Sequence, residues 1–310
     1  MSKLKKSLAF TSGAVALLGI GLATRNTLFI KKSKKEFPRL GKFCNVQGSS
    51  IHYFCEGAGK AVVFIHGEQG DMYDFYLSPL WSKLKKDHQL IAVDRPGYGY
   101  SSRADWKDYG FRNQGEIIHQ TLKLIGAQKP LLVGYGESCG IVLAMLMEHQ
   151  DMYSGAVLID EKLPHKIELN DKINTAPLLG KLLLWTISPV IAQKKANDRN
   201  KNLELPRENL KKSIMLDTLP NTILSSSQDK EFMKIDELKT LSEISKKISL
   251  PVTFIKRYDD LNNPNDFISQ LNLESLIARL HTVSADDLKS NSIPLTNSEK
   301  IITEINKILK

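Results

Sequence analysis

Cysteine is scarce in this sequence, with three residues in a chain of 310. An odd and sparse set of cysteines excludes a scaffold held together by disulfides, and it is typical of a reducing compartment. The spacing of Cys, His, Asp and Glu does not match that of a metal site. We therefore expect neither a metal nor a cofactor.

Net charge is absent from most of the chain. The formal charge of +9 arises within residues 1–42, which hold ten bases and one acid, whereas the remaining residues hold 33 bases and 33 acids. A basic excess confined to one end does not give a domain the basic face that nucleic acid requires. The sequence therefore predicts no nucleic-acid partner.

The basic residues flank one long uncharged stretch, Ser7–Thr24. Extended to Ile30, it is long enough to cross a hydrocarbon core of about 30 Å. A cleaved signal peptide is the alternative, because Gly21-Leu22-Ala23 resembles a cleavage site, but the bases that follow argue against export. We expect residues 1–30 to form a transmembrane anchor of undetermined orientation in a membrane protein, followed by a linker at residues 31–42.

Short apolar runs alternate with helical patterns along residues 43–310, which predicts an α/β domain. Such alternation is typical of a mostly parallel sheet with helices on both faces. Residues 162–248 interrupt the alternation and predict a helical cap over the carboxyl ends of the strands. Within the cap we expect one group of apolar side chains to pack on the core, in preference to the alternative that they dip into a membrane: Leu178, Leu182, Leu183, Trp185 and Ile187.

Two motifs carry a resemblance to a known family. An apolar strand runs directly into His66-Gly67, and the sequence DRPGYGYS occupies residues 94–101. In this order, each after a predicted strand, these motifs resemble the α/β-hydrolase superfamily. The resemblance implies the α/β-hydrolase fold, and it implies an oxyanion turn at His66, Gly67 and Glu68 whose Glu68 amide contributes to the oxyanion hole.

The family places its nucleophile at a sharp turn between a strand and a helix, and two registers compete here. In one, Gly136-Glu137-Ser138-Cys139-Gly140 is the turn and Ser138 is the nucleophile. In the other, Gly136 takes the nucleophile's place and Glu137 lines the pocket beside it. The family's usual spacing favours Gly136, and glycine adopts the strained positive φ of this position without penalty.

The resemblance also implies a histidine base and an orienting acid, and this sequence has no histidine at the position of the base. The loop after the last predicted strand, residues 284–292, has no histidine. His66 or His165 could reach the site, although neither stands at the family's position. Asp260 stands where the family's orienting carboxylate lies, with Asp259 as its neighbour.

Two functions follow from these residues. The first is a membrane-anchored homologue that lacks triad catalysis and binds a small apolar ligand, a lipid or an unknown protein partner beneath the cap. The alternative is a membrane-associated serine hydrolase that acts on carboxylic esters or lipids, with Ser138, Asp260 and an unusual base.

Overall fold

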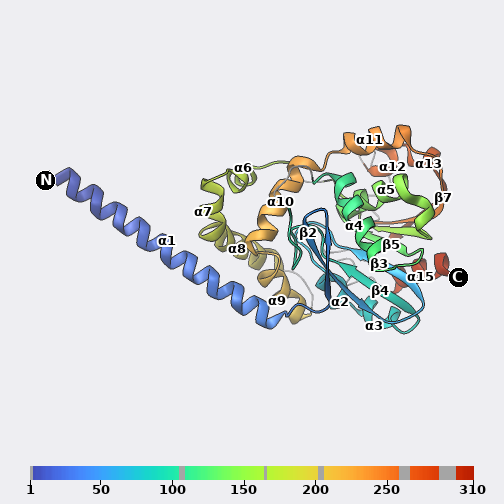
Figure 1. The fold of residues 1–310 in the computed structure, drawn as a ribbon, viewed down its shortest axis with the longest axis horizontal. Helices are drawn as coiled ribbons and strands as arrows, with labels where there is room; N and C mark the ends of the chain where they lie inside the picture. The colour runs from blue at the N-terminus through green and yellow to red at the C-terminus, as the bar shows by residue number, and fades with distance from the viewer. Residues whose placement is uncertain (1–2, 105–108, 164–165, 202–205, 258–265, 286–297) are drawn as a thin grey trace.

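A computed structural model of the chain describes residues 3–104, 109–163, 166–201, 206–257, 266–285 and 298–310 (Figure 1). In the first helix it describes the side chains from Leu17 onward. All structural statements below refer to these residues.

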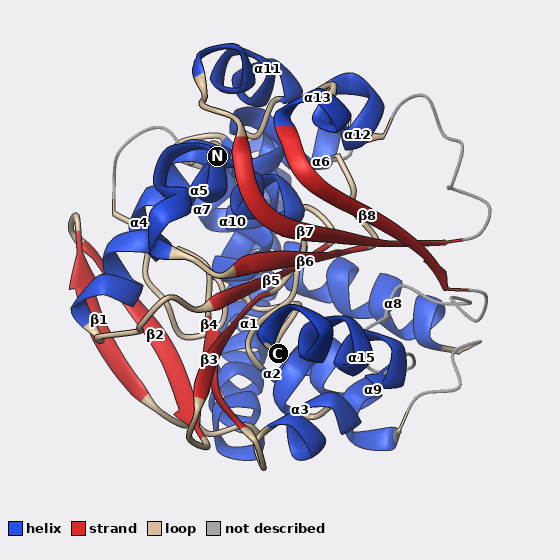
Figure 2. Cartoon of the chain, turned by 90° about the vertical axis from the view of Figure 1, so that its right-hand side faces the viewer, coloured by secondary structure: helices blue, strands red, loops and turns tan. Residues whose placement is uncertain are grey.

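One twisted sheet of eight strands forms the body, in the order β1-β2-β4-β3-β5-β6-β7-β8 (Figure 2). The strands β1 and β2 pair with each other antiparallel, β2 pairs with β4 antiparallel, and every later pair is parallel. The strands are β1 (Lys42–Val46), β2 (Ser49–Glu56), β3 (Lys60–Ile65), β4 (His88–Val93), β5 (Leu131–Tyr135), β6 (Gly155–Ile159), β7 (Ile248–Arg257) and β8 (Ile277–Ala285).

Continuous apolar runs form the central parallel strands, as the sequence predicts. In β3 the side chains from Val62 to Ile65 are all fully buried. A strand that is covered on both faces has no solvent side, so it needs no alternation of apolar and polar residues. The predicted α/β fold with a mostly parallel sheet is confirmed.

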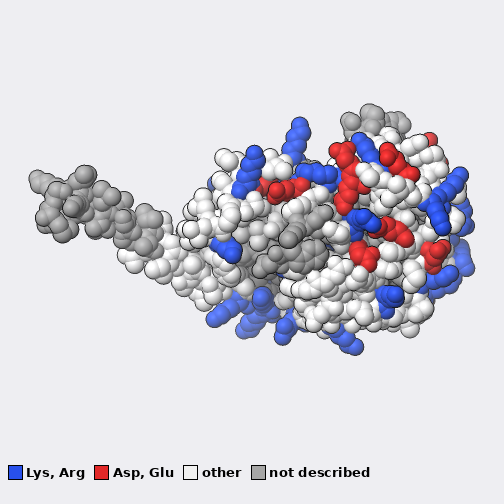
Figure 3. Space-filling model, turned by 45° about the horizontal axis from the view of Figure 1, so that its top comes forward, with Lys and Arg blue, Asp and Glu red and all other residues white. Residues whose placement is uncertain are grey.

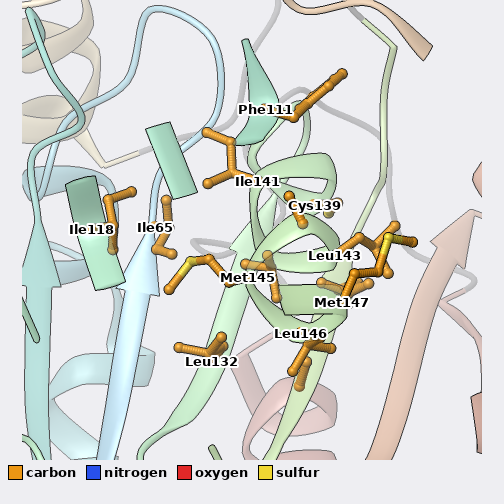
Figure 4. Close-up of a cluster of buried hydrophobic side chains, with 14 of the residues drawn as sticks. Ile65, Phe111, Ile118, Leu132, Cys139, Ile141, Leu143, Met145, Leu146 and Met147 are labelled. Carbon is orange, nitrogen blue, oxygen red and sulfur yellow. The ribbon is translucent and has the colours of Figure 1, made fainter. Parts of the chain in front are cut away.

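Helices cover both faces of the sheet. On one face Ile117, Ile141 and Leu238 belong to one apolar cluster, part of which Figure 4 shows. On the other face Phe75, Trp81 and Ile305 belong to a second cluster. The helices of the body are α2 (Tyr73–Tyr76), α3 (Pro79–Leu84), α4 (Phe111–Leu124), α5 (Ser138–His149), the 3-10 helix Gln150–Met152, α11 (Ile235–Ile244), α12 (Phe267–Gln270), α13 (Leu273–Leu276) and α15 (Ser298–Leu309).

The cap lies between β6 and α11. Its helices are α6 (Leu169–Thr175), α7 (Leu179–Trp185), α8 (Ser188–Asn200), α9 (Arg207–Met215) and α10 (Pro220–Phe232). Although the cap was expected to continue to residue 248, Leu238 and Leu241 of α11 pack into the core of the body. The segment after Phe232 therefore belongs structurally to the body.

The expectation that the apolar side chains of α7 pack on the core is wrong for most of them. Leu184 is buried and Leu183 is half-buried, whereas Leu178, Leu182 and Trp185 are 85%, 60% and 52% exposed. A short helix turns only one face toward its neighbours, and Leu184 takes that face here. Leu179, Leu182 and Trp185 of α7 are exposed, as are Leu178 just before the helix and Ile187 just after it.

The N-terminal segment forms the long helix α1 (Lys3–Glu36), which projects from the cap end of the molecule (Figure 1). It continues through half of the expected linker, because residues 31–36 contain no helix breaker and Pro38 lies just beyond its end. Among the described residues no helix is both long enough and apolar enough to cross a bilayer. The expected transmembrane helix is therefore not supported by the described residues.

Candidate functional site

The turn between β5 and α5 is the point where the two registers of the sequence can be compared. Gly136 has a φ of +61° there, in the left-handed region that favours glycine. Its amide donates a hydrogen bond of 2.9 Å to the Ile159 carbonyl oxygen of β6. Gly136 therefore occupies the sharp turn, and this position offers no side-chain atom for attack.

The space beside Gly136 is open. A Cβ atom built on this residue would meet the Cα atom of Gly67 at 3.7 Å, which is ordinary van der Waals contact. Backbone conformation, rather than crowding, is what favours glycine here.

Ser138 is fully buried at the first turn of α5. Its hydroxyl oxygen accepts a hydrogen bond of 2.8 Å from the Tyr135 amide, and it lies 2.6 Å from the Ile65 carbonyl oxygen, to which it donates. The side chain thus ties β3, β5 and α5 together. Because the Ser138 hydroxyl group is hydrogen-bonded to backbone atoms of two strands, it is not directed toward a substrate.

His66 follows β3 and is also buried. Its Nε2 accepts a hydrogen bond of 2.9 Å from the Arg95 amide, so the ring proton lies on Nδ1, which is 2.9 Å from the Gly67 carbonyl oxygen. Burial, and then the charge of Arg95, lower the pKa of His66 to about 4. Its basic nitrogen is occupied, so His66 holds the loop rather than accepting a proton from a nucleophile.

The side chain of Glu137 reaches the oxyanion turn. Its Oε2 atom accepts a hydrogen bond of 2.7 Å from the Glu68 amide, and a hydrogen bond from its own amide also stabilises its charge. The Glu68 amide is the one that the resemblance assigns to the oxyanion hole. The protein's own carboxyl group therefore occupies the donor that the resemblance assigns to a substrate oxygen.

The carboxyl group of Glu137 is almost completely buried. Burial, followed by the charge of Glu68, raises the pKa of Glu137 to about 7, and the two amide hydrogen bonds and Arg95 partly oppose that rise. Near neutral pH the carboxyl group is therefore partly protonated. Both the protonated and the ionised form have an acceptor oxygen, so both can keep the hydrogen bond from the Glu68 amide.

Asp260 and Asp259, the candidate orienting acids, lie outside the described residues, as does His165. The nearest described acids after β6 are already paired. Asp160 accepts two hydrogen bonds of 2.9 Å from Arg257, and Glu161 lies 2.8 Å from the Nζ atom of Lys256. These carboxylates are structural partners of cations at the end of β7.

A cavity of about 620 Å³ lies among the cap helices, with Gln69 of the body, the neighbour of Glu68, on its wall. Ser226 and Lys230 of α10 line it, and both contact Glu68, at 2.7 Å and 3.5 Å from its Oε1 atom. The cap contributes apolar side chains to its wall, among them Ile187 and Ile191. The cavity therefore joins an apolar wall to a charged group at the candidate site.

Among the described residues, one group resembles a set of metal ligands: Glu116, Glu148 and His149, whose candidate ligand atoms lie within 4.8 Å of one another. His149 Nε2 lies 2.8 Å from Glu116, and Arg112 lies 2.6 Å from Glu148. These contacts already occupy the candidate ligand atoms, and the group is partly buried on α4 and α5, away from the turn.

The comparisons with known proteins agree with this architecture. Residues 60–217, about half of the chain, match the family described as alpha/beta hydrolase fold. The chain belongs to the α/β-hydrolase fold family. The superfamily that the motifs resemble is therefore confirmed.

Curated relatives are similar to this α/β-hydrolase-fold chain over shorter stretches. A cis-3-alkyl-4-alkyloxetan-2-one decarboxylase of Shewanella oneidensis is 36% identical over 75 residues, which is 24% of this chain and 23% of that protein. The mesoderm-specific transcript protein of Mus musculus is 26% identical over 162 residues, 49% of this chain and 48% of that protein. The chain thus matches less than half the length of either relative.

Solved structures resemble this chain over most of its length. The Cif epoxide hydrolase of Acinetobacter nosocomialis has a TM-score of 0.67 and 19% identity, covering 93% of this chain and 97% of that one. At that identity the likeness shows the fold alone.

The role of the Glu137 side chain was not foreseen from the sequence. Glu137 was expected at the pocket, but its bond to Glu68 depends on two turns that are 69 positions apart. The one available signal was an acid placed directly after the turn residue, next to an expected pair of amide donors.

Proposed function

We propose that this protein binds a small amphipathic ligand beneath its cap and does not carry out the covalent catalysis of triad hydrolases. One observation carries the proposal. Gly136 stands at the turn, where catalysis needs an attacking side chain, and the Glu137 carboxyl group lies on the Glu68 amide. A covalent mechanism would need both the missing atom and the occupied donor.

The alternative, a serine hydrolase with Ser138 as nucleophile, gains no support from the geometry. The Ser138 hydroxyl is buried and is bonded to the backbone of Tyr135 and Ile65. A serine also needs a base within hydrogen-bond reach to be a useful nucleophile at neutral pH. Since the Nε2 atom of His66 accepts from Arg95, that histidine does not provide one.

The composition of the cavity wall supports an amphipathic ligand. Ile187, Ile191 and Ile223 provide apolar surface. Ser226 and Lys230 add a hydroxyl group and an ammonium group near Glu68. Acids also line the cavity, and one of them, Asp171, pairs with Lys230. Such a cavity suits a ligand with one hydrocarbon part and one polar group. A lipid fragment is one member of that class.

We also propose that α1 holds the protein at a membrane. The proposal is supported by the uncharged stretch Ser7–Thr24 and by the bases on both of its sides. It concerns association with the bilayer and does not require the helix to cross it.

Activity assays test the absence of catalysis. The purified full chain is incubated with short acyl esters, an aliphatic epoxide and a haloalkane, beside the variant Gly67→Ala. A Cβ atom at Gly67 would lie 2.9 Å from the Tyr135 carbonyl oxygen and 3.3 Å from Glu137, so the variant disturbs the oxyanion turn. Equal background rates are expected. A wild-type rate that Gly67→Ala lowers would contradict the proposal.

Ligand binding is tested with the amphipathic dye 1-anilinonaphthalene-8-sulfonate. The dye is expected to bind saturably to the wild type and not to Ala192→Phe, because Ala192 lines the cavity and a phenyl ring would fill it. Asn197→Phe, at an exposed position of the same helix, is the matched control and should bind normally. Equal binding by both variants would place the dye elsewhere and contradict the proposed site.

A further inference from the structure

Large apolar side chains are exposed mainly at one end of this molecule. Four lie on α1 and six lie on or beside α7 and α8: Leu17, Leu18, Ile20, Leu28, Leu178, Leu179, Leu182, Trp185, Ile187 and Ile191. We call these ten residues the cap-end face. Exposed apolar patches of this kind mark surfaces that bind a partner or a membrane.

Hydrogen bonds hold the two parts of the cap-end face together. The buried Asn26 side chain of α1 donates to the carbonyl oxygens of Trp185 and Thr186, at 3.0 Å and 2.7 Å. Arg25 donates to the Gln193 side chain of α8 at 2.8 Å. The helix α1 and the cap therefore present their apolar residues as parts of one body rather than as independent segments (Figure 1).

Charge of one sign accompanies this face. Residues 17–35 and 176–197 contain eight bases and no acid. The bases are Arg25, Lys31, Lys32, Lys34, Lys35, Lys181, Lys194 and Lys195, and all of them are exposed. Figure 3 shows blue side chains along the lower border of the white surface near the base of α1. The exposed acids that directly follow these ranges, Glu36 and Asp198, are each paired with a lysine, Lys211 and Lys201. Apolar residues among which cations predominate in this way are complementary to anionic headgroups above a hydrocarbon layer.

Two residues of this face also belong to the ligand cavity. Ile187, just before α8, and Ile191 of α8 are exposed, and both line the cavity within the cap. A surface that rests on the cap-end face would thus touch the outer wall of the cavity. This continuity connects the docking surface to the candidate site.

We propose that the cap-end face docks on the surface of an anionic bilayer, with Leu178, Leu182 and Trp185 of the cap inserted at the headgroup level. The inference rests on the proposed membrane association and adds to it a second contact, made by the cap, and a lipid class. Bound in this way, the protein has the apolar wall of its cavity next to the hydrocarbon layer, from which an amphipathic ligand can enter.

The test is vesicle flotation of the full chain with phosphatidylcholine alone and with added phosphatidylserine. Binding is expected to be much stronger with phosphatidylserine. Leu182→Asp should weaken the partition coefficient on the order of tenfold, because it removes an inserted apolar side chain. Lys181→Glu should weaken binding to the anionic vesicles by roughly fivefold or more.

Matched controls place the same changes elsewhere on the surface. Leu124→Asp on α4 and Lys246→Glu after α11 alter exposed positions away from the cap, and they should bind like the wild type. Trp185 adds a spectroscopic readout: its fluorescence should shift to the blue on anionic vesicles, and the shift should be lost in Trp185→Phe. The variants change exposed side chains, so circular dichroism should show them folded.

Several results would overturn the inference. If Leu182→Asp binds like the wild type while Leu17→Asp does not, α1 alone associates with membranes, and the proposed association survives without the cap contact. If the full chain binds neither vesicle, both proposals fail. If Leu182→Asp instead converts a dimer to a monomer in light scattering, the cap-end face is an interface between copies of the chain.

Discussion

The Glu137 carboxyl group accepts a hydrogen bond of 2.7 Å from the Glu68 amide, across 69 positions of the sequence. In the α/β-hydrolase fold this amide is the one expected to stabilise a developing oxyanion. Here its partner is an internal acid, and the residue before that acid, Gly136, has no side chain. Gly136 thus provides no side-chain atom for attack, and the neighbouring Glu137 occupies the amide that would stabilise an oxyanion.

The stability of the protein should depend on pH through Glu137. Its pKa is raised from the ordinary value of 4.5 to about 7, so between these values the unfolded chain is ionised while the folded site retains its proton. The unfolded state then binds fewer protons, and the free energy of unfolding falls as pH rises through this window. Glu137→Gln cannot titrate, so its stability relative to the wild type should improve between pH 5 and pH 8.

Urea unfolding at several pH values measures this difference, which should be on the order of a few kcal/mol. Burial also raises the pKa of Glu161 to about 7. Because Glu161 is present in both proteins, its titration cancels in the comparison. A difference between the two proteins that does not change with pH would contradict the assigned environment of Glu137.

Substitution of the turn glycine should strain the backbone. Gly136→Ala keeps a φ of +61°, which costs an L-residue about 1–2 kcal/mol of stability, while the new methyl group meets open space. Thermal unfolding measures the loss. Gly19→Ala is the control, because Gly19 lies within α1 with no atom within 4 Å of a new Cβ, and it should show no loss. Equal behaviour of the two variants would argue against the strained turn.

Removal of the Ser138 hydroxyl should affect stability rather than catalysis. Ser138→Ala leaves the buried Tyr135 amide and Ile65 carbonyl oxygen without this partner, at a cost of about 1–3 kcal/mol. Ser82→Ala removes an exposed hydroxyl bonded to Pro79 and should change the free energy of unfolding little. Chemical denaturation of the two variants checks the contrast, and a neutral Ser138→Ala would contradict the structural role.

The cap should depend on a buried charge pair. Asp229 of α10 bonds to Arg95, to Arg103 at 2.7 Å and to the Tyr98 hydroxyl at 2.8 Å. Asp229→Ala leaves two cations without this acid, and we expect a loss of about 3–5 kcal/mol. Asp198→Ala breaks the exposed pair with Lys201 and should change the free energy of unfolding little. Similar losses in the two variants, measured by urea unfolding, would contradict this account.

The sequence was sufficient to predict the body of the fold because its elements are encoded locally. The apolar run before His66 predicted β3, and the alternation of strand and helix patterns along residues 43–310 predicted the mostly parallel sheet. Glycine at the turn could also be preferred from spacing, and its positive φ agrees with that preference.

Two features could not be predicted because they depend on contacts between distant segments. The direction of the Glu137 side chain is determined by the Glu68 turn, which the local pattern around residue 137 does not contain. The exposure of Leu182 and Trp185 depends on how α7 sits on the cap. Periodicity shows which side chains share a helix face, but not whether another element covers that face.

The central claim is that the described residues of this site offer no serine hydroxyl group able to form a covalent intermediate. Intact-mass spectrometry after incubation with a fluorophosphonate probe tests it most directly, using the wild type and Glu137→Ala, in which the Glu68 amide is free of its internal acid. The account predicts no adduct on either protein at any pH between 5 and 9. An adduct that peptide mapping locates at Ser138 would contradict it.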